Sequence, residues 1–346
     1  MQRRDFLKLA TSSAGILLSA PSASGSPIPP RIMTVLGPVP AGSLGRTLMH
    51  EHVLVDFVGA DKIAPGRYDP EEVFQKALPH LQKLKSVGCG TLVECTPAYL
   101  GRDPELLRRL SRASGLHIIT NTGFYGAGHN KFLPEFAFSE TAEQLAARWT
   151  REFEEGIAPT GIRPGLIKTG VEHGPLSETH AKLLSAAALT HLRTGLVIAS
   201  HTGNGTAALA QLALLKERGV RPSAFIWVHA QNELATATHL EAAKQGAWVE
   251  FDGIPDKKFD RHIDLLLQMK EAGFLNRVLI SRDAGWYHVG EPGGGEYRGY
   301  HSLFTEFLPA ARKEGLSEDD SQTLLVRNPR RALSPSRQGK KSDLQT

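Results

Sequence analysis

The strongest constraint on the fold is an alternation of short β-rich runs with longer amphipathic helical patterns. The strand candidates are residues 47–57, 90–97, 117–125, 165–170, 195–202, 225–230, 248–253 and 278–284. Between them, apolar residues recur at helical spacing, as in residues 71–88, where Gly88 marks the end of the pattern. Eight strands joined by helices suit a closed parallel barrel, so the sequence predicts an α/β protein with a (β/α)8 TIM barrel.

The main alternative fold is a doubly wound open sheet. That fold would call for a glycine-rich turn after the first strand, and none is present there. The glycine-rich loop at residues 290–300 comes late and lacks the strand–helix context of a phosphate cradle, so we interpret it as a flexible active-site loop. Because no linker or internal repeat is visible, we expect residues 31–334 to form a single domain.

The two ends of the chain do not read as parts of the barrel. Residues 1–26 have a basic pair, Arg3 and Arg4, then a short apolar stretch and small residues, which is the layout of an export signal. The segment resembles a twin-arginine signal, which implies the twin-arginine export machinery as a partner and a periplasmic or otherwise exported location. An ordinary secretory signal or a membrane anchor is the alternative, although the apolar run is short for a bilayer span. Residues 335–346 are polar and basic, and they predict a disordered tail.

Charge and cysteine content exclude some classes of protein. The net charge is +4, and no basic stripe with interleaved aromatic residues is visible, so nucleic acid is not an expected partner. The two cysteines, Cys89 and Cys95, belong to one predicted strand, whose extended backbone would hold them apart. We therefore expect no disulfide bond between them.

The segment LMHEHVLVDF places His50 and His52 two residues apart in an apolar run. Because two residues is the period of a strand, both imidazoles should point to the same face. The intervening Glu51 has the opposite parity, so we expect its side chain to point away from the barrel interior.

Residues with metal-binding chemistry also recur where predicted strands end, which is the mouth that holds the active site in such barrels. With the first pair, they are His50, His52, Lys168, His201, His229 and Asp283. Singly, each has a structural explanation, such as a hydrogen-bonded histidine, a surface lysine or a helix cap. Together they favour a site for zinc or a similar divalent ion.

The ordered motifs around these residues resemble the phosphotriesterase family of the amidohydrolase superfamily. The motifs are HEH at 50–52, IKTG around Lys168, SHTG around His201, WVHAQNE around His229 and SRDAGW around Asp283. The resemblance also includes NTGFYGAGHNKFLPEF and LLVRNPRRAL, and it spans nearly the whole mature chain.

The resemblance implies two divalent metal ions, with zinc as the first expectation and manganese, cobalt or iron as alternatives. It implies that Lys168 is carboxylated and bridges the ions. His50, His52 and Asp283 would bind the more buried ion, and His201 and His229 the other. A hydroxide between the ions would attack the substrate, and Asp283 would accept its proton, which gives Asp283 a catalytic role. Family members also suggest a homodimer.

Further site residues are predicted around the metal ligands. Glu94 shares the inward parity of its strand, so it could partner a metal-ligating histidine. The expected substrate contacts are Tyr125, Arg282 and Trp286, with Asp252 as a further candidate, and Arg282 could face an anionic group. In the loop after the last strand, His288, Glu291 and Arg298 predict a polar or charged substrate.

The sequence thus predicts a zinc-dependent hydrolase of a small molecule that acts on a lactone, a carboxylic ester or a phosphoester. An organophosphate phosphotriesterase proper is one alternative. A mononuclear, deaminase-like amidohydrolase is another, but it would lack Lys168. An exported, non-catalytic metal-containing binding protein is the alternative from a different class, and it would be expected to lose Lys168 or Asp283.

Overall fold

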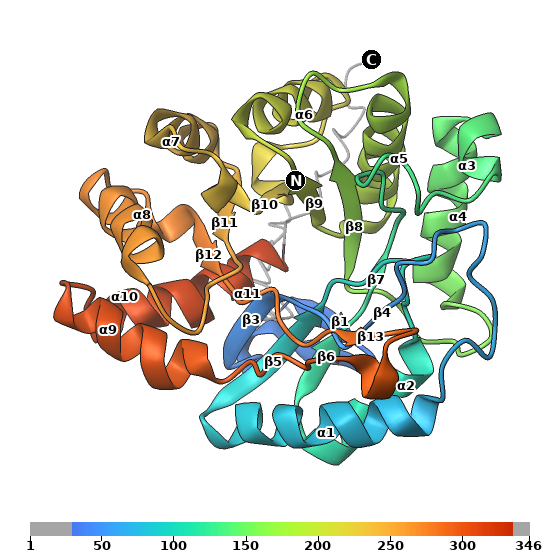
Figure 1. The fold of residues 1–346 in the computed structure, drawn as a ribbon. Helices are drawn as coiled ribbons and strands as arrows, with labels where there is room; N and C mark the ends of the chain where they lie inside the picture. Colours follow the sequence, from blue (N-terminus) through green and yellow to red (C-terminus); the bar gives the residue numbers. More distant parts are fainter. Residues whose placement is uncertain (1–29, 335–346) are drawn as a thin grey trace, which may run out of the picture.

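A computed structural model describes residues 30–334, so the predicted signal (1–26) and tail (335–346) lie outside the described residues. Parallel strands surround a central axis, with helices outside them (Figure 1). The barrel strands are β3 (Arg46–Glu51), β5 (Cys89–Glu94), β6 (His117–Ile119) continued by β7 (Asn121–Thr122), β8 (Leu166–Val171), β9 (Ile198–Thr202), β10 (Phe225–Val228), β11 (Trp248–Phe251) and β12 (Val278–Ile280).

Backbone hydrogen bonds close the barrel between the segments that carry its first and last strands. Strands β3, β5 and β6 pair in parallel, as do β7 to β12 in chain order. The N–H of Asp283 donates to the carbonyl of His50 at 3.0 Å, and the N–H of His52 donates to the carbonyl of Ala284 at 2.9 Å. The predicted α/β barrel is therefore confirmed, and the open doubly wound sheet is excluded.

Helices surround the barrel. They are α1 (Pro70–Ser86), α2 (Pro104–Ser114), α3 (Phe136–Ser139), α4 (Ala142–Glu155), α5 (Glu178–Thr194), α6 (Gly205–Glu217), α7 (Thr236–Gln245), α8 (Asp260–Glu271), α9 (Leu308–Lys313), α10 (Glu318–Gln322) and α11 (Asn328–Ala332). Short 3₁₀ or π turns are η1 (Ala41–Ser43), η2 (Pro222–Ala224), η3 (Ala230–Asn232), η4 (Leu275–Arg277), η5 (Pro292–Gly294), η6 (Leu303–Phe307) and η7 (Thr323–Arg327). Within residues 30–334, no helix has the length and apolar character needed to cross a membrane.

A hairpin that the sequence analysis did not predict packs at the N-terminal end of the barrel. It pairs β1 (Arg31–Thr34) with β2 (Gly37–Pro40) in antiparallel fashion. Ile32 from the hairpin and Leu333 after α11 join the apolar cluster that includes Met49, Leu166 and Leu279 on the barrel strands. Burial of this cluster stabilises that end of the barrel, because apolar surface removed from water contributes roughly 25 cal/mol per Å² to the free energy of folding.

The opposite mouth is shaped by a second small pairing. Strand β13 (Tyr287–His288), in the loop after β12, pairs with β4 (Leu54–Val55), which follows β3. This pairing ties the last long loop to the first one beside the C-terminal ends of the strands. Cys95 lies near this mouth, and Cys89 opens β5 at the other end of the barrel. Both are buried and free, so the expected absence of a disulfide bond between them is confirmed.

Candidate metal centre

The predicted metal ligands all meet in one cavity at the C-terminal mouth of the barrel. This cavity has a volume of about 220 Å³. Its lining includes His50, His52, Lys168, His201, His229 and Asp283. These residues lie on or directly after β3, β8, β9, β10 and β12, so the barrel brings together side chains that are far apart in the sequence.

One group of donors centres on the carboxylate of Asp283. Its Oδ1 lies 3.1 Å from Nε2 of His52 and 3.9 Å from Nε2 of His50. Within residues 30–334, this buried oxygen has no hydrogen-bond partner, and one ligand atom from each of the three residues fits within 4.8 Å of the others. A buried carboxylate oxygen without a hydrogen bond, facing two ring nitrogens, suits a divalent cation.

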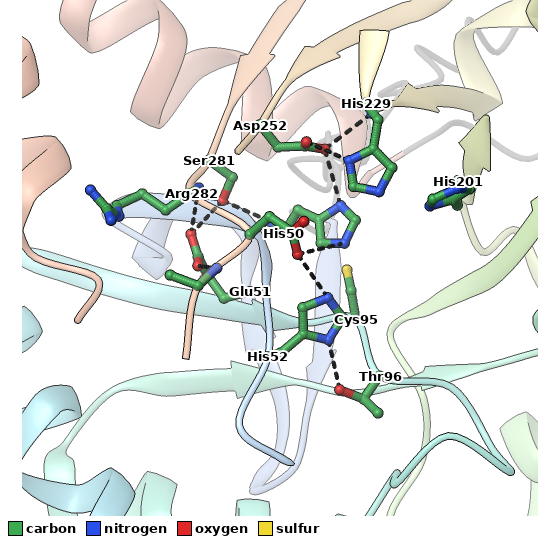
Figure 2. Close-up of polar contacts among 12 residues, drawn as sticks. His50, Glu51, His52, Cys95, Thr96, His201, His229, Asp252, Ser281 and Arg282 are labelled. Atoms are coloured by element: carbon green, nitrogen blue, oxygen red, sulfur yellow. Dashed lines mark hydrogen bonds and ion pairs between the residues drawn. The ribbon is translucent and has the colours of Figure 1, made fainter. Parts of the chain in front are cut away.

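Asp252, just after β11, orients two of the imidazoles. Its Oδ1 lies 2.5 Å from Nδ1 of His229, and its Oδ2 lies 3.2 Å from Nδ1 of His50. Figure 2 shows Asp252 reaching both rings from one side. Although these three residues are also close enough to hold an ion, the carboxylate occupies the Nδ1 positions and leaves both Nε2 atoms for a metal. Asp252 is therefore placed to hold ligands, where a substrate contact was expected.

The remaining two imidazoles have neutral hydroxyl partners. Nδ1 of His52 lies 2.7 Å from Oγ1 of Thr96, and Nδ1 of His201 lies 3.0 Å from the hydroxyl of Tyr125. The sequence analysis missed Thr96. Its position two residues after Glu94, at the end of a barrel strand, was the available signal.

Burial keeps most of these imidazoles neutral. Desolvation, helped by the nearby Lys168, lowers the pKa of His50 to about 3, and burial also lowers the pKa of His52 and His201. Burial opposes protonation of His229 as well, but the adjacent Asp252 carboxylate outweighs it and raises the pKa of that ring. Neutral imidazole is the form that binds metals, so three of the four rings need to release no proton at neutral pH.

The ionised form of Asp283 is also favoured. Burial alone would raise the pKa of this carboxyl group, but the close approach of His52 and the other neighbouring imidazoles lowers it below its ordinary value. The backbone of Asp283 has φ of 51° and that of His229 has φ of 62°, a region that side chains other than glycine rarely occupy. Such strain persists where surrounding contacts fix the backbone, and it gathers at functional sites.

Glu51 supplies some of those contacts. Its carboxylate is fully buried and accepts hydrogen bonds from the Ser281 hydroxyl and from the backbone N–H groups of Arg282 and Ala284, each at 2.8 Å. Figure 2 shows it turned toward this segment and away from the histidine cluster. Glu51 thus stays outside the candidate ligand set, as parity predicted, but it holds the segment that carries Asp283.

The structure does not place Glu94 against a metal-binding imidazole. Its carboxylate accepts hydrogen bonds from the backbone N–H of Val53 at 3.3 Å and of Thr96 at 3.2 Å. The prediction that Glu94 partners a metal-ligating histidine is corrected accordingly: Glu94 fixes the chain next to His52, whereas Thr96 contacts the ring. Burial raises the pKa of Glu94 to about 8.

Arg282 does not reach the cavity, so its predicted role in substrate binding is wrong. The side chain is fully buried, pairs with Asp256 at 2.8 Å and donates to the Ser302 hydroxyl. Arg282 and Asp283 point to opposite sides of the segment that follows β12, since Asp283 lines the cavity and Arg282 pairs with Asp256. Tyr125 and Trp286 do line the cavity, and the Trp286 ring centre lies 4.7 Å from that of His52.

The rest of the cavity wall is largely apolar, which corrects the expected polar lining. The apolar side chains are Val55, Phe57, Pro97, Leu100, Phe132 and Trp286. The three polar loop residues predicted to face the substrate are absent from this wall. Arg298 donates to the backbone carbonyl of Asp283 at 3.0 Å, and His288 stacks on Trp286, which separates it from the cavity. The pairing of β13 with β4 fixes the loop in this arrangement.

Comparisons with known proteins agree with this geometry. A model of the phosphotriesterase family matches residues 30–333. The phosphotriesterase homology protein of Escherichia coli (strain K12) is 31% identical over 290 residues, which cover 82% of this chain and 96% of that protein. The N-acetyltaurine hydrolase of Dictyostelium discoideum is 29% identical over 274 residues, which cover 74% of this chain and 72% of that protein. Among solved structures, a triple mutant of an organophosphorus hydrolase from Deinococcus radiodurans matches with a TM-score of 0.79 at 28% identity, covering 87% of this chain and 97% of that one.

Proposed function

This chain belongs to the phosphotriesterase family, and from that premise we propose that it is a binuclear metal-dependent hydrolase of small carboxylic esters or lactones. One observation carries the proposal: six residues with metal-binding chemistry converge on one cavity whose other walls are largely apolar. The donor set fits divalent ions, since it combines imidazoles that burial keeps neutral with a carboxylate held in its ionised form.

In the proposed arrangement, His50, His52 and Asp283 hold one ion, while His201 and His229 hold the other. Lys168 is buried in the same cavity, and a carbamate on its amine would supply one anionic oxygen to each ion. Zinc is proposed first because it prefers nitrogen and carboxylate ligands, with manganese, cobalt or iron as alternatives. When bound, such ions lower the pKa of a water molecule toward neutrality and polarise the oxygen of the substrate.

The side chains then have separable tasks. The carboxylate of Asp283 accepts the proton of the attacking water and passes it toward the leaving group. Asp252 and Thr96 keep the imidazoles oriented through their Nδ1 atoms. The hydroxyl of Tyr125 lines the cavity next to His201 and can donate a hydrogen bond to the substrate oxygen.

The wall of the cavity suggests the substrate class. Phe57, Phe132 and Trp286 offer aromatic surface within a volume of about 220 Å³, which suits a small acyl or alcohol group. Among the residues that line the cavity, Lys168 is the only lysine or arginine, and it belongs to the proposed ligand set. A strongly anionic substrate would therefore lack a free cationic partner there.

The same apolar wall favours a second candidate, hydrolysis of neutral organophosphate triesters. A triester carries no net charge and presents apolar groups, so it matches the wall as well as a carboxylic ester does. A similar solved structure is named as an organophosphorus hydrolase. Amide hydrolysis, suggested by the name of the N-acetyltaurine hydrolase relative, fits less well because taurine derivatives carry a sulfonate.

A parallel substrate panel tests these assignments. The chain is purified, loaded with zinc or manganese, assayed for bound metal, and given a lactone, an aryl carboxylic ester, a phosphotriester and N-acetyltaurine. We expect two equivalents of metal and the highest kcat/KM for the lactone or the carboxylic ester. A preference for the phosphotriester would support the second candidate. Metal binding without turnover of any substrate would instead support the non-catalytic binding protein.

We also propose export through the twin-arginine machinery to the periplasm, on the basis of the paired Arg3 and Arg4. Replacing both arginines with lysine should leave the protein in the cytoplasm, as fractionation would show. A homodimer is proposed on family resemblance, and its test is the mass of the purified protein in solution.

A further inference from the structure

A second cavity, of about 340 Å³, lies at the opposite end of the barrel from the metal centre. It is lined by Ser223, Trp248, Arg277, Arg330, Arg331 and Ser334, among others. Ser223 lies two residues before β10, Arg277 directly precedes β12, and Trp248 opens β11, so these residues mark the N-terminal ends of three strands. His229 and Asp283 of the candidate metal centre lie beyond the C-terminal ends of β10 and β12, and the two cavities share no lining residue, so they are separate sites.

Two of the three arginines, Arg277 and Arg331, are held against an indole ring. The Cζ atom of Arg277 lies 5.2 Å from the ring centre of Trp248, and that of Arg331 lies 5.6 Å away. Arg277 also donates to the carbonyl of Gly246 at 3.1 Å, and Trp248 itself donates to the carbonyl of Ser223 at 3.1 Å. Stacking on an aromatic ring and one carbonyl contact fix a guanidinium while leaving most of its five N–H donors free.

This gathering of positive charge lacks a counter-charge in the described structure. Within residues 30–334, ion pairs join other arginines to carboxylates, as in Arg327 with Asp319, but none involves the three arginines of this cavity. Burial, and to a lesser degree the neighbouring charge of Arg331, lower the pKa of Arg277. The hydroxyl of Ser334, also at this cavity, is buried with no hydrogen-bond partner in the described part of the chain.

We propose that this cavity is a binding site for a multivalent oxyanion, such as the phosphate group of a small phosphate ester. The forked donors of Arg277, Arg330 and Arg331 match the oxygens of such a group, and the Ser334 hydroxyl supplies a further donor. The volume of the cavity, about 340 Å³, and the indole of Trp248 in its wall suit a small molecule. Binding would stabilise the folded chain by mass action, at a site that needs no metal.

Calorimetric titration of the full chain with inorganic phosphate, at constant ionic strength, tests the proposal. We expect one saturable site whose Kd rises roughly tenfold or more in the double variant Arg330→Gln/Arg331→Gln, because each charge-assisted contact contributes substantially. Both arginines are exposed, so the variant should fold, which hydrolytic activity equal to that of the wild type would verify. Arg218→Gln, at an exposed arginine outside the cavity, is the control for loss of a surface arginine.

Phosphate also ligates metal ions, so a further variant separates the two sites. Lys168→Ala disrupts the proposed metal centre at the other mouth, and it should keep the phosphate affinity of the wild type. The proposal is overturned if the wild type shows no saturable binding, or if Arg330→Gln/Arg331→Gln binds phosphate as the wild type does. It is overturned equally if Lys168→Ala, and not the arginine variant, abolishes binding.

Discussion

The carboxylate of Glu51 accepts a 2.8 Å hydrogen bond from the backbone N–H of Ala284, next to Asp283. The same carboxylate accepts the N–H of Arg282 and the hydroxyl of Ser281. Asp283 lies between these contacts with φ of 51°. A residue from the first barrel strand thus fixes the backbone of a candidate metal ligand that follows the last strand.

Replacing Glu51 with Ala should therefore weaken both the fold and the metal centre. The variant leaves one hydroxyl and two backbone donors buried without acceptors, at a cost of about 3 kcal/mol in the free energy of unfolding. Denaturant unfolding and metal analysis would measure the two effects. Glu51→Gln keeps one acceptor oxygen, so it should lose less stability and less bound metal than Glu51→Ala. A Glu51→Ala protein with the stability and metal content of the wild type would contradict this role.

Asp252 should control metal affinity through two imidazoles. Its carboxylate approaches Nδ1 of both His229 and His50, so Asp252→Asn introduces a donor where an acceptor is needed. We expect metal affinity to fall roughly 10- to 100-fold, which is typical when the partner of a ligating histidine is lost. Competition with a chelator would measure the metal affinity of the variant and of the wild type. Asp264→Asn, at an exposed aspartate on α8, is the control, and equal affinities in the two variants would refute the assignment.

The positions of the candidate ligands could be predicted because barrel geometry fixes them. In a parallel barrel all C-terminal strand ends open at one mouth, so His50, His201 and Asp283 had to converge once the strands were recognised. Parity along the last strand would also have excluded Arg282, since Asp283 points inward. That error came from treating neighbours in sequence as neighbours in the site.

The contacts around the ligands depend on tertiary register, which the sequence does not reveal. The pairing of β3 with β5 shifts register between Leu48 and Glu51, so alternation gives the face to which Glu51 points but not the donors that Glu51 and Glu94 reach. The character of the cavity wall depends on the pairing of β13 with β4, which turns His288 away from the cavity. Two-residue strands within long loops leave no periodic signal in the sequence.

Glu94 should make stability depend on pH. Its pKa is raised from 4.5 in the unfolded chain to about 8 in the fold. Between these values the folded protein keeps a proton that the unfolded chain has released, so stability falls as pH rises through this window, by up to about 1.4 kcal/mol per pH unit. Glu94→Gln lacks this proton, so its unfolding free energy should fall less over the same range. If the unfolding free energies of the two proteins changed equally with pH over this range, the prediction would be contradicted.

Lys168→Ala should abolish most of the hydrolytic activity. The proposed carbamate would supply oxygens to the metal ions, and its loss should lower kcat/KM roughly 1,000-fold, which corresponds to several kcal/mol of transition-state stabilisation. Short carboxylic acids such as propionate should restore part of the rate, because they can replace the missing oxygens. Lys216→Ala, at an exposed lysine on α6, is the control. An unchanged rate in Lys168→Ala would rule out the bridging role.

Phe132 should set the affinity for the apolar part of the substrate. Its ring lines the cavity and packs against Phe57 and Tyr125, with ring centres 6.0 and 5.9 Å apart. Phe132→Ala removes aromatic surface from the wall but touches no candidate metal ligand, so KM for an aryl ester should rise roughly tenfold while metal content stays constant. Phe138→Ala, at a phenylalanine that is 49% exposed and outside the cavity, should leave KM unchanged. If Phe132→Ala lowered metal content and left KM unchanged, the ring would support the metal centre, and the substrate would bind elsewhere.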